Sequence, residues 1–179
     1  MLQERRDAQF LVVELVRQLN RVRSWSGATQ VQKCTFFLRH LFGVPLPYEF
    51  VIYHYGPFSF ELDEDLALMR FRGWLEAELG DGYGVHYHPG PKAPRQLPRT
   101  VRQFRDEVKS VARLFGKADA KWLGLLATSY YVQEKMAAGG RSSDEIVAAV
   151  KRLKPHFGES EISAALQQLD EIRRAVGSP

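Results

Sequence analysis

Cysteine is almost absent from this sequence of 179 residues, in which Cys34 stands alone. A single cysteine excludes a disulfide framework within the chain and fits a reducing compartment, so we expect a cytoplasmic protein. Long apolar runs are missing too. None approaches the roughly 20 residues that a membrane-spanning helix needs, and no early run resembles a signal peptide. We therefore expect no membrane partner.

The usual signatures of cofactor and metal sites are also missing. No glycine-rich loop links a strand to a helix with a following lysine, as phosphate binding requires. Cys34 lies on the apolar stripe of a predicted helix, where free cysteine usually packs as a small hydrophobe rather than acting as a nucleophile. His86 and His88 could hold a metal together, but no third ligand is marked, and solvated histidines on a hairpin are the favoured interpretation. The sequence thus predicts no catalytic residue, no cofactor and no enzyme.

An acidic cluster at the start of a predicted helix has two interpretations. It could hold Mg²⁺ or work as an acid–base pair. Acidic residues in a first helical turn are also what the helix dipole favours, and we prefer that interpretation. The cluster consists of Glu61, Asp63, Glu64 and Asp65.

Hydrophobic periodicity predicts an α+β protein that is mostly helical. The order is helix, helix, strand, helix and hairpin, which is typical of a winged-helix-like unit with a small antiparallel sheet. A proline-rich segment then leads into four helical segments, the third of which begins at a capping box formed by Ser142 and Glu145. We predict a winged-helix-like unit over residues 1–90, a linker over 91–100 and a helical extension over 101–179 that can pack with the first unit as one domain. The predicted elements of the first unit are helices over 8–22, 28–42 and from about 60 to 72, a strand over 48–55 and a hairpin over 75–87.

The turn between the predicted strand and third helix has the strongest local signals. Pro57 fixes its own φ and keeps Gly56 out of the helical region, so the strand ends there. Ser59 can cap a helix that begins near Phe60, and Gly73 can end that helix in a left-handed turn. Leu62, Leu66 and Met69 then share the buried face.

Charge is distributed unevenly along the chain, whose net charge is +4. Residues 56–90 contain 2 basic and 7 acidic residues, a net charge of −5, whereas residues 91–123 contain 9 basic and 3 acidic residues, a net charge of +6. The spacings of three and four within the second segment predict one basic stripe along a helix. A solvated helix face and a nucleic-acid surface are equally good interpretations of this stripe, which consists of Arg102, Arg105, Lys109 and Arg113.

Aromatic residues around the turn are candidates for binding a partner protein. Tyr53, Tyr55 and Phe58 flank Gly56-Pro57, and tyrosine is enriched in interface hot spots. The alternative is that at least two of the three pack the third helix against the strand.

Three sequence blocks also carry a resemblance: Thr29-x-Val31-Gln32-Lys33-x-x-Phe36-Phe37, Tyr55-Gly56-Pro57-Phe58-Ser59-x-x-Leu62-x-x-Asp65-Leu66, and Gly73-Trp74-Leu75. Together they resemble the Panacea domain family, also called SocA-like antitoxins. The helical part is similar to the YwgA-type branch, through Leu125-Leu126-Ala127-Thr128 and Lys154-Pro155-x-Phe157. The chain departs from the family pattern in a longer basic C-terminal extension.

The resemblance implies an antitoxin-like or adaptor module that binds a partner protein directly, such as a small toxin. It carries over no catalytic residue. The alternative from the order of elements is a winged-helix regulator that binds nucleic acid through the basic stripe. The acidic third helix argues against docking of that helix in a major groove, because duplex DNA carries about one negative charge per 1.7 Å.

Charge reversal tests the basic stripe. Replacing Arg102, Arg105 and Lys109 with glutamate should abolish salt-sensitive binding of an acidic ligand, because exposed charges act over a screening length of about 8 Å at physiological salt. Neutralising Glu61, Glu64 and Asp65 should leave that binding unchanged or strengthen it. Affinity across a salt series measures both effects, with circular dichroism as the fold control, and wild-type binding by the stripe variant would contradict the assignment.

Overall fold

The computed structural model describes residues 2–79, 84–137 and 139–177. Over these residues the fold is mostly helical α+β, as the sequence predicts. Two separate antiparallel hairpins replace the single small sheet that we expected. The elements are α1 (Leu2–Arg21), α2 (Ala28–His40), β1 (Val51–Tyr53), β2 (Gly56–Phe58), α3 (Phe60–Phe71), β3 (Leu75–Leu79), β4 (Val85–Pro89), the 3₁₀ turn η1 (Arg102–Phe104), α4 (Arg105–Phe115), α5 (Ala120–Ala137), α6 (Ser143–Leu153) and α7 (Glu159–Val176).

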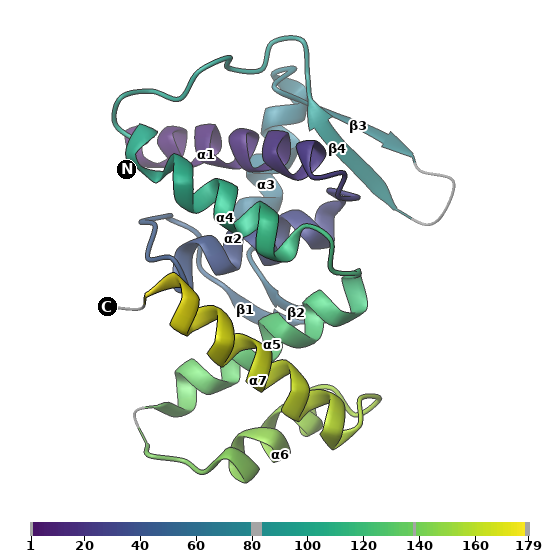
Figure 1. Ribbon diagram of the computed structural model, residues 1–179. Helices are drawn as coiled ribbons and strands as arrows, with labels where there is room; N and C mark the ends of the chain where they lie inside the picture. Colours follow the sequence, from purple (N-terminus) through teal and green to yellow (C-terminus); the bar gives the residue numbers. More distant parts are fainter. Residues whose placement is uncertain (1, 80–83, 138, 178–179) are drawn as a thin grey trace.

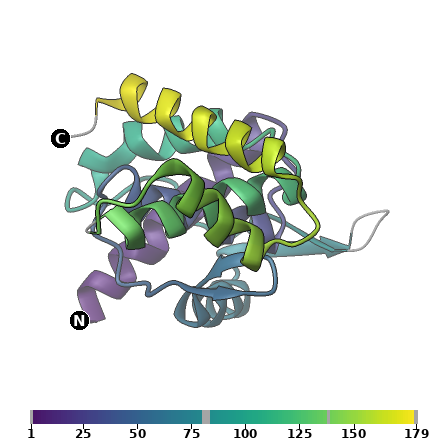
Figure 2. The same cartoon turned by 90° about the horizontal axis from the view of Figure 1, so that it is seen from below.

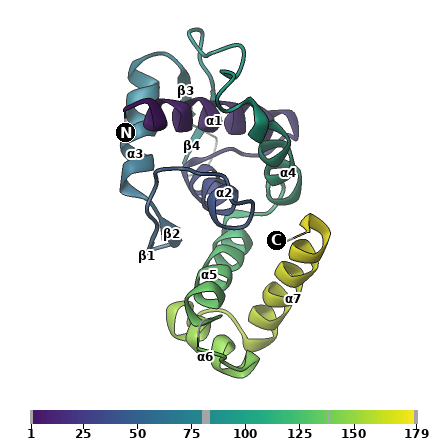
Figure 3. The same ribbon diagram turned by 90° about the vertical axis from the view of Figure 1, so that its left-hand side faces the viewer.

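Helix α2 lies at the centre of the molecule, between α1 and α4 on one side and α5 on the other (Figures 1 and 3). Its nine residues from Gln30 to Leu38 are all buried. Helices α6 and α7 pack on α5 at the end of the molecule farthest from α1 (Figure 3). One hydrophobic core runs from Ala8 in α1 to Ile172 in α7, so the helices that follow the proline-rich segment share buried surface with the first unit.

The hairpin formed by β3 and β4 projects from the body of the molecule (Figure 2). Its register pairs Leu75 with Pro89 and Leu79 with Val85, which confirms the predicted hairpin. The turn that we predicted at residues 80–82 lies outside the described residues. A bridge between Gly27 and His86 attaches β4 to the segment that joins α1 and α2.

The segment around Gly56-Pro57 differs from the prediction. We expected a strand over 48–55 that ends in a turn, but the paired strand covers only Val51–Tyr53 and the chain folds back at once into β2. Gly56 has a φ of +100°, which an L side chain rarely adopts, and it allows this tight reversal. The residues before Val51 are tied elsewhere, since the Tyr48 hydroxyl donates to Asp65 at 3.0 Å.

The helix signals of the sequence are confirmed. The Ser59 hydroxyl accepts from the Leu62 amide and caps α3, and Gly73 follows α3 with a φ of +72°. Ser142 and Glu145 form the complete capping box of α6. Helix α1 begins at Leu2, earlier than predicted, because its first turns pack on α3 through the ion pair of Arg5 with Asp65.

Alanine at position 56 should destabilise the protein far more than alanine at position 43. Both glycines have a positive φ, which costs an L residue about 1 kcal/mol. A Cβ on Gly56 would also lie 2.5 Å from Thr128 Oγ1, whereas a Cβ on Gly43 would meet nothing within 4 Å. We expect Gly56→Ala to lose about 3 kcal/mol of unfolding free energy and Gly43→Ala about 1 kcal/mol. Urea unfolding measures both, and equal losses would contradict the proposed close approach.

Candidate functional site

The β1–β2 hairpin is fixed to the core by two adjacent residues of α2. The Gln32 side chain pairs with both backbone groups of Ser59: its amide donates to the carbonyl at 2.9 Å, and its oxygen accepts from the Ser59 N–H at 3.0 Å. The Lys33 ammonium donates to the Pro57 carbonyl at 2.9 Å. On the other side, Gly56 lies against Thr128 of α5. The hairpin is therefore held rigidly by α2 and α5.

Lys33 is an unusual buried charge. Its side chain is only 2% exposed, and its described partner is the neutral carbonyl of Pro57. Burial, together with the smaller effect of the nearby positive charge of Lys154, lowers the pKa of Lys33 to about 8. Burial lowers the pKa of Lys154 as well. No sequence pattern indicates that Lys33 anchors the hairpin, although Lys33 stands in one of the blocks that carry the resemblance.

An aromatic patch covers the outer side of the hairpin and the start of α3. Tyr53 is 47% exposed, Tyr55 71% and Phe60 53%, and Phe58 is half-buried beside them. The Tyr53 ring lies 5.6 Å from the Phe58 and Phe60 rings, and Phe58 meets Phe60 edge to face at 5.1 Å. The structure thus brings Tyr53 and Phe58 into ring contact with each other and with Phe60 of α3, and leaves Tyr55, on the same hairpin, the most exposed of the predicted anchors. We call Tyr53, Tyr55, Phe58 and Phe60 the hairpin aromatic patch.

The predicted acidic cluster divides into one buried and three surface residues. Glu61 accepts from the Ser59 hydroxyl, and Asp63 and Glu64 are exposed on α3. Asp65 is fully buried, where it accepts from Arg5 at 2.9 Å, from Gln9 at 2.8 Å and from Tyr48. Burial and the Asp65 carboxylate raise the pKa of Tyr48 well above its usual value. Asp65 is therefore an anchor for α1 and α3, a role that neither interpretation of the cluster included. Its neutralisation in the charge test above would destabilise the fold, so only Glu61 and Glu64 serve as the acidic variants there.

The basic stripe is less uniform than its spacing suggested. Arg102 lies in η1 rather than in the α-helix, and its guanidinium donates to the Leu97 carbonyl. Arg105, Lys109 and Arg113 are exposed on α4, and Lys109 forms an ion pair with Asp106 at 3.0 Å. Figure 3 shows α4 and the β1–β2 hairpin on opposite sides of the molecule. The sequence-predicted site residues thus form two separate surfaces.

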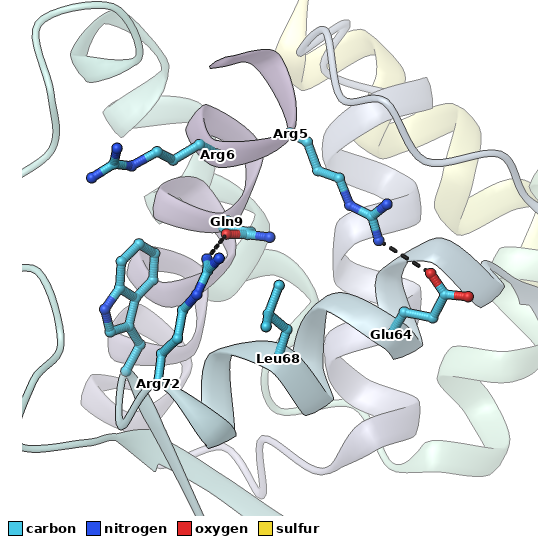
Figure 4. A pocket seen from close by; sticks show the side chains of 7 residues that line it. Arg5, Arg6, Gln9, Glu64, Leu68 and Arg72 are labelled. Carbon is cyan, nitrogen blue, oxygen red and sulfur yellow. Dashed lines mark hydrogen bonds and ion pairs between the residues drawn. The ribbon is translucent and has the colours of Figure 1, made fainter. Parts of the chain in front are cut away.

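A pocket between α1 and α3 is lined by three arginines that no sequence pattern singles out; Arg5 points toward Glu64, Arg72 toward Gln9, and Arg6 to the other side of the pocket (Figure 4). Its volume is about 710 Å³, and Leu68 forms part of its wall. Arg5 reaches Glu64 at 3.2 Å, and its hydrogen bond with Asp65 raises the pKa of the guanidinium. We call this site the arginine pocket; the arginines are Arg5, Arg6 and Arg72.

Two aromatic rings support the arginine pocket. Phe10 stacks on Trp74 with a centroid distance of 5.2 Å. The Arg6 guanidinium lies 5.8 Å from the Phe10 centroid, and that of Arg72 lies 5.6 Å from the Trp74 centroid. Such contacts hold guanidinium groups over ring faces. No sequence pattern could have revealed this pocket, because Arg5 and Arg6 are more than 60 residues from Arg72 in the chain.

The remaining candidates lie away from these sites. Cys34 is fully buried, as predicted, and burial raises the pKa of its thiol. His86 and His88 are half-buried rather than solvated, since His86 stacks on Trp25 at 5.4 Å and His88 Nε2 lies 3.2 Å from Glu78 Oε1. Within residues 2–79, 84–137 and 139–177, no group of three or more His, Cys, Asp or Glu is placed to hold a metal ion.

Two further findings concern the membrane and the comparisons. In the described part of the chain, no helix combines the length and the apolar character needed to cross a bilayer. Neither a protein-family model nor a curated protein matches the sequence.

The stability of the protein should rise in mildly alkaline solution because of Lys33. The unfolded chain keeps the Lys33 proton up to about pH 10.5, whereas the folded protein releases it near pH 8. Between these values the folded state binds fewer protons, so its stability increases with pH. We expect wild type to gain ~3 kcal/mol of unfolding free energy relative to Lys33→Met between pH 8 and 10.5.

Urea unfolding of both proteins over this pH range measures the gain. Lys109→Met is the matched control, since Lys109 is exposed, and its difference from wild type should stay nearly constant. A constant difference between wild type and Lys33→Met would contradict the lowered pKa.

Proposed function

We propose that this chain is a non-enzymatic protein-binding module, antitoxin-like or an adaptor, that acts in the cytoplasm and binds a partner protein through the hairpin aromatic patch. The observation that carries the proposal is the exposure of two tyrosine rings on a hairpin that is held rigidly, with the exposed Phe60 ring beside them at the start of α3. Large exposed apolar patches mark interaction sites in soluble proteins. The resemblance to the Panacea domain family supports the same class of function.

Rigid anchoring of the hairpin favours binding. The hydrogen bonds from Gln32 and Lys33 fix the backbone of Ser59 and Pro57, and Tyr53 lies on the strand that pairs with this segment. A patch that is already ordered loses little conformational entropy when a partner docks. Tyrosine also presents a large apolar surface with a polar tip, which suits a contact that is exposed before binding.

Charge next to the patch indicates the kind of partner. Glu61, Asp63 and Glu64 lie on α3 directly after Phe60, and the last two are exposed. A basic partner segment would complement this acidic surface, and the attraction between opposite charges would raise its association rate. We therefore infer a small basic protein as the partner, with apolar side chains that meet the rings.

The observation on Cys34 agrees with a role other than catalysis. The thiol is fully buried and its pKa is raised, so it is poorly suited to act as a nucleophile. The anchoring groups Lys33 and Asp65 are engaged with Pro57 and with Arg5 and Gln9. Their polar atoms are used to position the hairpin and α3.

A second candidate function is nucleic-acid binding by a winged-helix-like unit. The order from α1 to β4 and the bridge between Gly27 and His86 support it, as does the exposure of Arg105, Lys109 and Arg113 on α4. The test is binding of a DNA duplex across a salt series. Salt-sensitive binding would favour this function over the first if it is lost when Arg105, Lys109 and Arg113 are replaced and kept when the hairpin aromatic patch is truncated.

Truncation of the patch should abolish partner binding without unfolding the protein. Candidate partners are captured from a lysate of the source organism, identified by mass spectrometry, purified and titrated by calorimetry. We expect Tyr55→Ala and Tyr53→Ala each to weaken binding roughly tenfold or more, as hot-spot residues do. Affinity should also fall with salt because the partner is basic.

Phe71→Ala is the matched control. Phe71 is an aromatic residue at the far end of α3 and is 89% exposed, so its loss should leave affinity unchanged. An equal loss in all three variants would overturn the assignment of the patch. Light scattering first measures the oligomeric state of wild type and of the tyrosine variants. If wild type is a dimer and the tyrosine variants are monomers, the patch serves self-association and the partner proposal is overturned.

A further inference from the structure

We propose that the arginine pocket binds a phosphate monoester with an apolar body. This site follows α3 from Glu64 to Arg72, past the hairpin aromatic patch, and it does not depend on the function proposed above. The pocket has a volume of about 710 Å³ and combines three guanidinium groups with Leu68 and Trp74 (Figure 4). Its volume falls in the range of about 300–1,000 Å³ that holds small ligands.

The pocket is built on a chain of hydrogen bonds that ends on a buried carboxylate. Asp65 accepts from Arg5 and from the Gln9 amide, and the Gln9 oxygen accepts in turn from Arg72 at 2.9 Å. Gln9 is only 3% exposed. One buried carboxylate thus orients two guanidinium groups, directly and through an amide, before any ligand arrives. Such prior orientation reduces the cost of binding.

The charges favour a dianion. Asp65 and Glu64 both contact Arg5, whereas the Arg6 and Arg72 guanidiniums are held over the rings of Phe10 and Trp74. Two carboxylates therefore oppose three guanidiniums. A phosphate monoester carries about −1.5 to −2 charges at pH 7 and three acceptor oxygens, and guanidinium groups bind such oxygens in pairs. A single carboxylate supplies less charge and fewer acceptors.

Glu64 would compete with the phosphate for Arg5. Its carboxylate contacts Arg5 at 3.2 Å while its side chain remains 72% exposed. Exposed ion pairs contribute little to stability, so a dianion can displace this contact. Glu64 is then an internal competitor, and its removal should strengthen binding.

The organic part of the ligand would lie against Leu68 and Trp74. Both side chains line the pocket, and both offer apolar surface. Inorganic phosphate would leave that surface uncovered. We therefore expect a phosphate monoester with an aromatic or aliphatic body to bind more tightly than phosphate alone, since burial of apolar surface is favourable.

Calorimetric titration with phenyl phosphate, inorganic phosphate, phenyl sulfate and benzoate tests the ligand class. Phenyl phosphate should bind most tightly. Equal affinity for inorganic phosphate would overturn the contribution of the organic body, and equal affinity for phenyl sulfate or benzoate would overturn the preference for a dianion. Binding of none of the four probes would overturn the site.

Substitutions locate the site. Arg72→Gln and Arg6→Gln should each weaken phenyl phosphate binding roughly tenfold or more, because each removes hydrogen bonds to a charged group. Arg70→Gln is the matched control, with the same change of charge on α3 at an exposed residue outside the pocket lining. If all three variants lose affinity equally, the effect is one of general charge and the pocket is not the site.

The Glu64 variant gives a test of opposite sign. Glu64→Gln should tighten binding severalfold, whereas Asp63→Asn, which removes the same charge at the neighbouring exposed residue, should change it little. Ligand binding should also change the fluorescence of Trp74, and Trp74→Phe should remove that change. Circular dichroism and thermal melts show that each variant is folded. Equal tightening of binding by Glu64→Gln and Asp63→Asn would overturn the proposal. So would a Trp74→Phe variant whose fluorescence still changes on ligand binding as much as that of wild type.

Discussion

The attachment of residues 57–59 to Gln32 and Lys33 is the interaction on which much of this structure depends. A buried backbone amide and carbonyl need partners, because an unmade hydrogen bond costs about 1–3 kcal/mol. The segment that contains Pro57 has no sheet of its own beyond the short β1–β2 pairing. The Gln32 amide supplies both partners of Ser59, and the Lys33 ammonium supplies one for Pro57. With these bonds the hairpin is fixed, α3 begins at its cap, and the aromatic rings face outward.

Burial of Lys33 without a carboxylate shows how strongly the packing requires this attachment. Desolvation of an ammonium is unfavourable, and the lowered pKa of Lys33 reflects it. Lys154 adds repulsion to this desolvation. The fold tolerates the cost because α2 and α5 enclose the site from both sides and Gly56 permits their close approach. A neutral polar residue of shorter reach at position 33 would leave the Pro57 carbonyl without its donor.

Asp65 plays a corresponding role in the middle of α3. It joins α1 to α3 through Arg5 and Gln9, and it holds the segment before β1 through Tyr48. Because one buried carboxylate serves three donors, the positions of α1, α3 and the arginine pocket are coupled. The start and the middle of α3 are thus both tied to other elements, and the exposed side chains are the adaptable part of the surface.

The sequence by itself determined the local elements. Periodicity and caps predicted the helices, the α3 cap at Ser59, the capping box of Ser142 and the β3–β4 hairpin, because these depend on neighbouring residues. Only the tertiary structure decided the roles of Lys33, Asp65 and the arginine pocket. Each depends on side chains that are 24 to 67 residues apart, and no local pattern reports which distant residue will lie opposite. The spacing of Asp65, three residues after Leu62 and four before Met69, already places it on the buried face of α3, but only the tertiary structure shows that Arg5, Gln9 and Tyr48 are its partners.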